Sequence, residues 1–506
     1  MRRSVGSVLV IAAAALAAGE ASAADRWIKA TSPNFVIYTD VNEAGARRLA
    51  DQLEAFDQLL RLRHGVPVTE PVRRKLPIYL LRRKGDLRRI SPGISANVEG
   101  FYTSSSDDTY AVAVEGDGSR NLLHEYVHHF MLRRFPAGYP GWLVEGYPEF
   151  FSTFRRTPEY IEIGKADENR VYWLANQRWL PYRKVLASTP STIRSSEDQA
   201  MFYAQAWGLT HWFLSDPQRS KQLNAYIDAV GEGADPVAAL QTATGLTPEQ
   251  LDTAVRIYLT RGFSYHRLKL TLAPAPVTVE TLPASAGDVL LPTLRVKNDN
   301  GVDAPDDRTD GPVLLEAVRK AAGPHAGDRL ADLALARVEV KLGDAARAET
   351  LLKARIAADA KDVEALQLMA ALKLKAAKGA TPEAARTLVR EAQRWAGQAH
   401  KLDPDYYPTL IVYAQAREGG AGYPNENDLN VLVDALDLAP QVGTLRLKAA
   451  QALVARRRTA EAAKMLAPLA FNAHGGTTAA EARAVLEGLQ ASAGATATQA
   501  SAGGAR

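Results

Sequence analysis

Two histidines four residues apart, His124 and His128, enclose a glutamate, Glu125, and another glutamate, Glu145, follows seventeen residues after His128. Residues four apart share one face of an α-helix, so both imidazoles can reach one ion. Zinc readily accepts two imidazole nitrogens and a carboxylate oxygen, and catalysis leaves its fourth position to water. Glu125, one step round the helix, can take a proton from that water. The spacing predicts a zinc-dependent hydrolase.

The residues around this motif favour a buried amphipathic helix. Its apolar positions are Leu122, Leu123, Val127 and Met131. We expect the helix to start near Gly118, with Ser119 as its capping residue, and to run to about Phe135, before Pro136. The alternative is a structural helix whose histidines are satisfied polar groups near the core.

The segment from Trp142 to Phe151 reads Trp-Leu-Val-Glu-Gly-Tyr-Pro-Glu-Phe-Phe. Together with the His-Glu-x-x-His motif, it resembles the gluzincin branch of zinc metallopeptidases, and more narrowly the bacterial exported domains described as peptidase MA-like. The similarity extends from Thr31 through Gly262. It implies an α+β metallopeptidase domain that binds one zinc ion and hydrolyses peptides, with Glu145, of the Glu-Gly pair, as the third zinc ligand beside the two histidines.

The same resemblance suggests a role for Glu149, four residues after Glu145. In gluzincins an acid at this offset can hydrogen-bond the distal nitrogen of a zinc-bound histidine and fix its tautomer. The alternative for Glu149 is an exposed helical acid. Pro148 departs from the alanine usual in such motifs. Near a first helical turn a proline is tolerated, whereas deeper in the helix it would bend the segment and displace Glu145.

Further candidates lie downstream at four-residue spacing: Tyr203, Trp207 and His211. Tyr203, or alternatively His211, is predicted to donate a hydrogen bond to the oxyanion formed when water attacks a carbonyl. Trp207 on the same stripe favours the competing interpretation that all three belong to the core. His129 points about a quarter turn away from His128, so we expect it to pack or to lie at the surface.

Composition restricts the class of protein. The chain has 506 residues, so two or three folding units are expected, and 46% hydrophobic with 23% charged residues is typical of globular proteins. The 61 basic residues nearly balance 57 acidic ones, which argues against a nucleic-acid partner. The chain contains no cysteine, so nitrogen and oxygen must hold any metal.

Residues 1–23 are predicted to be a secretory signal peptide. Arg2 and Arg3 supply the positive start, an apolar run from Val8 to Ala18 follows, and Ala21-Ser22-Ala23 offers a cleavage site. We therefore expect a periplasmic or secreted protein with no membrane span after cleavage. The alternative is an uncleaved anchor, although the apolar run is short for a bilayer.

Residues 24–270 are predicted to form the metallopeptidase domain, an α+β fold with a mixed sheet ahead of the metal helix. The expected strands cover 34–39, 76–81 and a hairpin of 98–103 with 109–114, and the expected helices cover 43–63, 199–214 and two stretches of 236–262. The strand at 98–102 is either an edge strand that pairs with an extended peptide or an ordinary sheet strand.

Beyond this domain, residues 271–311 are rich in proline and aspartate and are predicted to be a linker with one or two short strands. Residues 312–490 are rich in Ala and Leu, and 331–342 with 345–358 suggests an antiparallel helix pair. These stretches resemble tetratricopeptide repeats, which implies an all-α array, and we estimate about three degenerate repeats between 325 and 475. Residues 491–506 are predicted to be disordered.

These observations support one leading function and two alternatives. The leading hypothesis is an exported zinc metallopeptidase that cleaves a peptide or protein substrate, with the repeats recruiting a substrate or a protein partner. The first alternative is a non-catalytic, or weakly catalytic, interaction scaffold in which the repeats act and the zinc-binding domain does not cleave. The second keeps the zinc but places the reaction on a non-peptide amide, such as a cell-wall cross-link.

Overall fold

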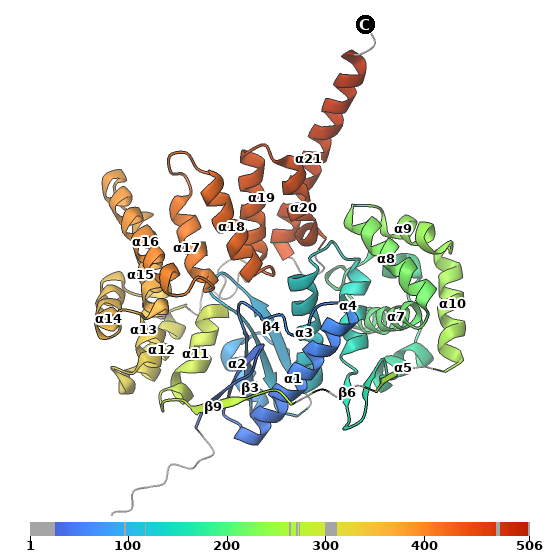
Figure 1. Cartoon of the computed structure of the whole chain (residues 1–506), viewed down its shortest axis with the longest axis horizontal. Helices are drawn as coiled ribbons and strands as arrows, with labels where there is room; N and C mark the ends of the chain where they lie inside the picture. Colours follow the sequence, from blue (N-terminus) through green and yellow to red (C-terminus); the bar gives the residue numbers. More distant parts are fainter. Residues whose placement is uncertain are drawn as a thin grey trace, which may run out of the picture.

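A computed structural model describes residues 26–95, 98–116, 118–262, 265–269, 272, 274–298, 311–471 and 476–503 of the chain (Figure 1). The predicted signal peptide, 1–23, lies outside the described residues. Figure 1 shows a central sheet with covering helices, a lobe of further helices on one side, and an array of helix pairs along the opposite side. Within the described residues, every helix is too short or too polar to cross a bilayer.

A six-stranded mixed sheet in the order β4-β5-β3-β2-β1-β9 forms the centre of the N-terminal region. β2, β3 and β5 run parallel to one another, whereas β1 pairs antiparallel with both β2 and β9. β4 pairs antiparallel with β5 and lies at one edge. The predicted strands and the hairpin are therefore confirmed, and the strand near residue 100 is an edge strand. The strands are β1 Ile28–Thr31, β2 Phe35–Thr39, β3 Leu76–Leu81, β4 Gly100–Ser104, β5 Thr109–Val114 and β9 Thr278–Thr281.

Helices cover both faces of this sheet, because successive strand residues point to opposite sides and both sets are apolar. On one face, Ile37 and Ile78 share a core with residues of α1 and α3. On the other face, Tyr79 and Tyr110 pack with residues of α2 and α11. The covering helices are α1 Glu43–Arg63, α2 Leu87–Ile90 after the 3-10 turn Lys84–Asp86, α3 Gly118–Arg134 and α11 Ala286–Asn298.

A buried polar contact fixes the motif-bearing helix α3 against α1. The Tyr126 hydroxyl donates to Asp57 Oδ1 at 2.6 Å, and Arg61 Nε donates to Asp57 Oδ2 at 2.6 Å. Asp57 and Arg61 are both buried, and the Phe35 ring meets the Tyr126 ring edge-on. A buried carboxylate with such partners is costly to separate from them. The contact therefore fixes how α3 sits on α1.

A helical lobe follows α3 and contains a small sheet in the order β6-β7-β8. The helix predicted over 199–214 begins three residues earlier, because the Ser195 side chain caps its first turn by accepting from the Asp198 amide. The elements of the lobe are α4 Gly141–Phe151, β6 Arg155–Arg156, β7 Ile161–Ile163, α5 Glu168–Asn176, α6 Tyr182–Ala187, the 3-10 turn Pro190–Thr192, α7 Ser196–Leu214, α8 Pro217–Gly231, α9 Pro236–Thr244, α10 Pro248–Thr260 and β8 His266–Leu268.

The prediction of a linker is wrong for residues 274–298, although a short strand predicted within it is present. β9 completes the sheet beside β1, and α11 packs Leu290, Leu291 and Leu294 onto the sheet. The prolines that suggested a connector do not prevent this, because Pro292 lies inside α11 while burial of the apolar side chains stabilises the helix. Residues 299–310 lie outside the described part of the chain.

The C-terminal region is all-helical, as predicted, and consists of antiparallel pairs. Four pairs occur between α13 and α20, one more than we estimated, and the 21-residue α16 lengthens the interval between the second and third pairs. The predicted pair near 331–358 is confirmed. The helices are α12 Gly311–Ala322 with the 3-10 turn Gly323–His325, α13 Arg329–Leu342, α14 Ala345–Ala358, α15 Val363–Ala377, α16 Pro382–Leu402, α17 Tyr407–Arg417, α18 Glu426–Leu438, α19 Gly443–Ala455, α20 Thr459–Ala470 and α21 Gly476–Gly503.

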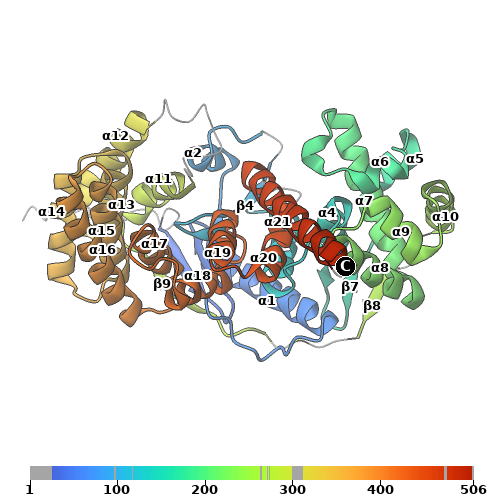
Figure 2. The same ribbon diagram turned by 90° about the horizontal axis from the view of Figure 1, so that it is seen from above.

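The last helix contradicts the predicted disordered tail. α21 continues through 491–503, and its alanine content explains this because alanine has the highest helix propensity. Residues 504–506 lie outside the described residues. Figure 2 shows the array running from α14 across the central sheet to α20 and α21, close to the helical lobe.

The array is anchored on the tip of the β4–β5 hairpin. Asp108 accepts from Arg74 at 2.7 Å and from Lys297 at 2.7 Å, while Asp107 forms ion pairs with Arg337 and Lys341 of α13. The Tyr407 hydroxyl of α17 donates to the Ser105 carbonyl at 2.7 Å. These contacts join the hairpin to two separate parts of the array.

We predict that Asp108→Asn destabilises the protein by about 2 kcal/mol at neutral pH. Burial would raise the pKa of Asp108, but Lys297, Arg74 and Arg337 lower the pKa to about 2, from an ordinary value of 3.8. This stabilisation is full above pH 3.8 and is lost as the pH falls towards 2. Urea denaturation should therefore show that the difference in the free energy of unfolding between the two proteins becomes smaller as the pH falls.

The matched control is Asp198→Asn, which removes a more exposed ion pair with Lys184. Exposed pairs contribute about 1 kcal/mol or less, so its effect should be small at every pH. Equal stability of the Asp108→Asn and wild-type proteins at pH 7 would contradict a stabilising role for the ion pairs of Asp108 with Arg74 and Lys297.

Candidate metal centre

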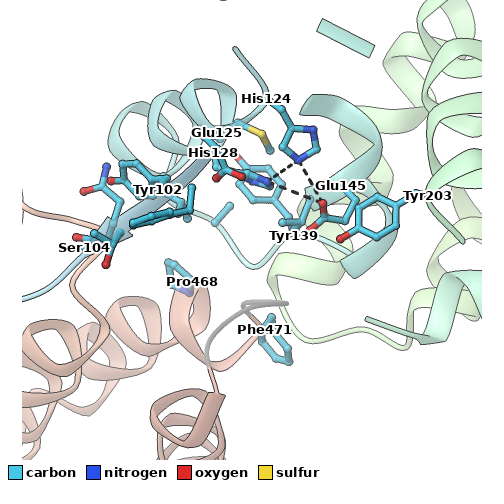
Figure 3. Close-up of a pocket in the computed structure, with 17 residues that line it drawn as sticks. Tyr102, Ser104, His124, Glu125, His128, Tyr139, Glu145, Tyr203, Pro468 and Phe471 are labelled. Carbon is cyan, nitrogen blue, oxygen red and sulfur yellow. Dashed lines mark hydrogen bonds and ion pairs between the residues drawn. The ribbon is translucent and has the colours of Figure 1, made fainter. Parts of the chain in front are cut away.

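Three candidate ligand atoms from two helices converge beside the middle of α3. His124 Nε2 lies 3.2 Å from His128 Nε2 and 3.5 Å from Glu145 Oε2, and His128 Nε2 lies 3.9 Å from the same oxygen (Figure 3). A tetrahedral zinc ion with bonds of 2.0–2.1 Å spaces its ligand atoms by about 3.3–3.4 Å. The set of two nitrogens and one oxygen, at nearly these separations, fits zinc.

The three ligands open onto a cleft of about 470 Å³ that Glu125 also lines. The imidazoles of His124 and His128 are 16% and 12% exposed, while the Glu145 carboxylate is 1% exposed. The remaining walls come from β4, α4, α7 and the end of the helical array, and include Tyr102, Ser104, Tyr139, Tyr203, Pro468 and Phe471. A ligand in the cleft would therefore meet the imidazoles and Glu125 together.

The position of Glu145 depends on its neighbour Gly146. A Cβ atom at Gly146 would lie 2.3 Å from the Ala206 carbonyl oxygen and 2.4 Å from Thr210 Oγ1 of α7. Only glycine permits this approach of the two helices. The glycine of the Glu-Gly pair thus brings α4 against α7, and the preceding carboxylate meets the imidazoles of α3.

Pro148 lies beyond the first turn of α4, deeper than the position at which a proline is readily tolerated. The helix nevertheless continues to Phe151, and the Ser152 amide donates to the Pro148 carbonyl at 2.8 Å. Glu145 precedes the proline and keeps its place beside the histidines. The displacement that a deep proline would cause is therefore not observed.

Glu149 is buried beside the candidate metal ligands, so the alternative interpretation of Glu149 as an exposed helical acid is wrong. Its carboxylate accepts two hydrogen bonds from Arg170, at 2.7 and 3.0 Å, and lies 3.5 Å from His124 Nδ1. Burial would raise the pKa of Glu149, but the charge and hydrogen bonds of Arg170, with His124 and Arg120, lower it. An ionised Glu149 directs the opposite nitrogen of His124 towards the metal position.

In the metal-free protein, the surroundings of His124 favour its protonated form. Burial lowers the pKa of His124, but the hydrogen bond to Glu145 and the charges of Glu149, Glu145 and Glu125 outweigh burial and raise it. A metal ligand must be deprotonated, so metal binding at this site is coupled to release of a proton.

Tyr203 lies in the cleft beside Glu145 (Figure 3). Burial, with the charges of Glu145 and Glu149, raises the pKa of Tyr203, so its hydroxyl keeps the proton that a hydrogen-bond donor needs. The Arg170 guanidinium lies 5.4 Å from the centre of its ring. The core interpretation therefore does not apply to Tyr203.

The other downstream residues face away from the cleft. His211 Nε2 lies 2.8 Å from the Gly164 carbonyl and its Nδ1 lies 2.7 Å from the Tyr258 hydroxyl, so the prediction of His211 as an oxyanion donor is wrong. Trp207 is fully buried. His129 is a packing histidine, as predicted, and burial lowers its pKa to about 3.

Several residues of the site gave no signal in the sequence. Arg170 is held by α5, and Gln441, Pro468 and Phe471 come from the far end of the array. Each lies in a segment with no recognisable motif, and only the folded chain brings it to the cleft.

Comparisons with known proteins add little to this geometry. No protein-family model and no curated protein matches the chain. Among solved structures, a thermophilic TPR protein of Thermus thermophilus aligns with 16% identity over 40% of this chain and 99% of its own, at a TM-score of 0.34. At so low a score the likeness supports no argument, and the description of the array rests on its own helix pairs.

We predict that Glu149→Gln weakens zinc binding by about ten- to a hundredfold, because His124 loses the charge that orients it. Competition with a chromophoric chelator at pH 7.5 measures the affinity. Glu168→Gln, at an exposed acid of α5, is the matched control and should bind zinc as the wild type does. Equal affinities of the two variants, with both folded by circular dichroism, would remove this role for Glu149.

Proposed function

We propose that this protein is a zinc metallopeptidase that hydrolyses peptide bonds, of the gluzincin type that its two motif segments resemble. The observation that carries the proposal is the convergence of His124, His128 and Glu145, with Glu125 in the same cleft. Each of these four residue types is needed for this chemistry. Their meeting from two separate helices supports a functional site over histidines that merely satisfy a core.

When bound, zinc would supply a water that is nucleophilic near neutral pH and would polarise the scissile carbonyl. Glu125 accepts the proton of the attacking water and returns it to the leaving amine. Tyr203, which keeps its proton, donates a hydrogen bond to the oxygen that becomes negative. Glu149 holds His124 in the required orientation, with Arg170 balancing its charge.

The edge strand supports a peptide over other amides as the substrate. β4 lines the cleft through Tyr102 and Ser104, and β4 pairs with β5 on one side only in the described sheet. An extended peptide can add to such an edge through its backbone and lie across the imidazoles. The proposal therefore favours a protein or peptide substrate in an extended conformation.

Action outside the cytoplasm is part of the proposal and rests on the sequence of residues 1–23 alone. The helical pairs of the array support a second role, recruitment of a protein partner, because stacked helix pairs present extended binding surfaces. The non-catalytic scaffold remains the alternative, and stoichiometric zinc without cleavage of any protein would favour it.

We predict that Glu125→Gln binds zinc as tightly as the wild type and hydrolyses peptides about 10²–10⁴-fold more slowly. The amide keeps the three ligands intact but cannot accept the proton. Elemental analysis after dialysis against a chelator and digestion of a peptide library give the two readouts. Glu145→Ala, by contrast, should lose zinc in the same dialysis. Unchanged hydrolysis by Glu125→Gln would remove the proposed base.

We also predict that Tyr203→Phe lowers kcat about a hundredfold with little change in KM, because the lost hydrogen bond forms only as the oxyanion develops. Zinc content should stay at the wild-type level. The matched control is Tyr172→Phe, at an exposed tyrosine of α5. If both variants turn over at the wild-type rate, Tyr203 has no part in the reaction.

A further inference from the structure

The end of the helical array forms one wall of the candidate active-site cleft. Gln441, between α18 and α19, and Pro468 and Phe471, at the end of α20, line the same cleft as the metal ligands. Figure 3 shows Pro468 and Phe471 across the cleft from the imidazoles, with Tyr139 on the near side. The cleft is thus built by segments more than 300 residues apart in the chain.

Close contacts fix this wall to the N-terminal region. At Gly138, in the loop after α3, an added Cβ would lie 2.7 Å from Cδ2 of Phe471 and 3.3 Å from its Cβ. Glycine at this position therefore lets the aromatic ring lie against the loop. Gln441 Nε2 donates to the His129 carbonyl at 3.3 Å, so the array also contacts the helix that carries the metal motif.

The chemistry of this wall is apolar, whereas the metal side of the cleft is charged. Pro468, Phe471, Ala137 and Tyr139 all line the cleft, and none of the four carries a charge. Phe471 and Tyr139 are only partly buried, so part of each side chain is exposed. Partly exposed aromatic rings beside a cleft favour contact with an apolar group.

We propose that Phe471 and Pro468, with Ala137 and Tyr139, form a subsite for a large apolar side chain of an extended peptide. The identity of the ligand as a peptide rests on the proposed function. Side chains of an extended chain alternate in direction, so one of them can enter the subsite while the backbone follows the edge of β4. The array then selects substrates directly, besides any partner that it recruits.

A disulfide trap tests the position of the wall without any assay of activity. The chain has no cysteine, so Gly138→Cys with Phe471→Cys introduces one possible pair. The 3.3 Å between the two Cβ positions is close to the 3.5–4.5 Å of natural disulfides. Mild oxidation should form the intramolecular bond quantitatively, seen by mass spectrometry of the intact protein. Failure to form it in folded protein would overturn the placement.

Binding of defined peptides tests the subsite itself. The probes are fluorescein-labelled decapeptides of Ala, Ser and Gly that carry one Phe at each position in turn, with the Phe-free parent as reference. Fluorescence anisotropy is measured on zinc-loaded Glu125→Gln protein, in which the cleft is intact. We expect one Phe position to improve Kd at least tenfold over the parent, because burial of an aromatic side chain contributes this much.

Phe471→Ala in the Glu125→Gln background should abolish that tenfold preference, and Phe471→Leu should retain most of it. Val433→Ala, at an exposed apolar residue of α18, is the matched control and should leave the preference unchanged. A preference that survives Phe471→Ala, or no binding by any of the peptides, would overturn the subsite. The subsite and the peptidase proposal can fail separately. If Phe471→Ala abolishes the preference, but the wild-type protein hydrolyses peptides no faster than the Glu125→Gln protein, the subsite is supported and the peptidase proposal is refuted.

Discussion

The helices α4 and α7 meet at Gly146 with their backbones in contact, and the position of Glu145 depends on that contact. α4 is a weak helix by itself: it has eleven residues, no side-chain cap and a proline in its interior, which costs about 3 kcal/mol. Ten of its eleven residues are buried, so packing supplies the stability that local sequence does not. Burial of α4 against α7 thus holds Glu145, the candidate third ligand, beside the two histidines of α3.

Charge explains why this arrangement suits a cation. Three carboxylates, those of Glu125, Glu145 and Glu149, lie around the two imidazoles, and Arg170 and Arg120 form ion pairs with Glu149. Buried carboxylates are costly without opposite charge. In the metal-free protein the hydrogen bond to Glu145 and the charges of the three carboxylates raise the pKa of His124, and a divalent ion would replace that proton.

The β4–β5 hairpin connects this centre to the helical array. Its strand β4 lines the cleft, and its tip is held between α13 and α17 by Asp107 and by the carbonyl of Ser105. The array contacts the cleft again at its other end, through Phe471. An element that contacts the cleft at both of its ends is a structural part of the candidate site.

Local residue patterns were enough to predict several features of the fold and of the candidate site. The pair of histidines on one helical face, the strand pattern at 35–39 and 76–81, and the helix over 43–63 all depend on periodicity, and the structure has them. The sequence also placed Glu145 and Tyr203 among the candidates, although Glu145 as third ligand came from a family resemblance.

Other features depend on long-range packing and could not be predicted from local patterns. They include the helix α11 around Pro292, the pairing of Glu149 with Arg170, the burial of His211 against Gly164 and the cleft wall formed by Phe471. Burial against such partners overrides local propensity, and no local pattern records which segments will meet. The motif therefore identified the chemistry, while packing decided which other residues surround it.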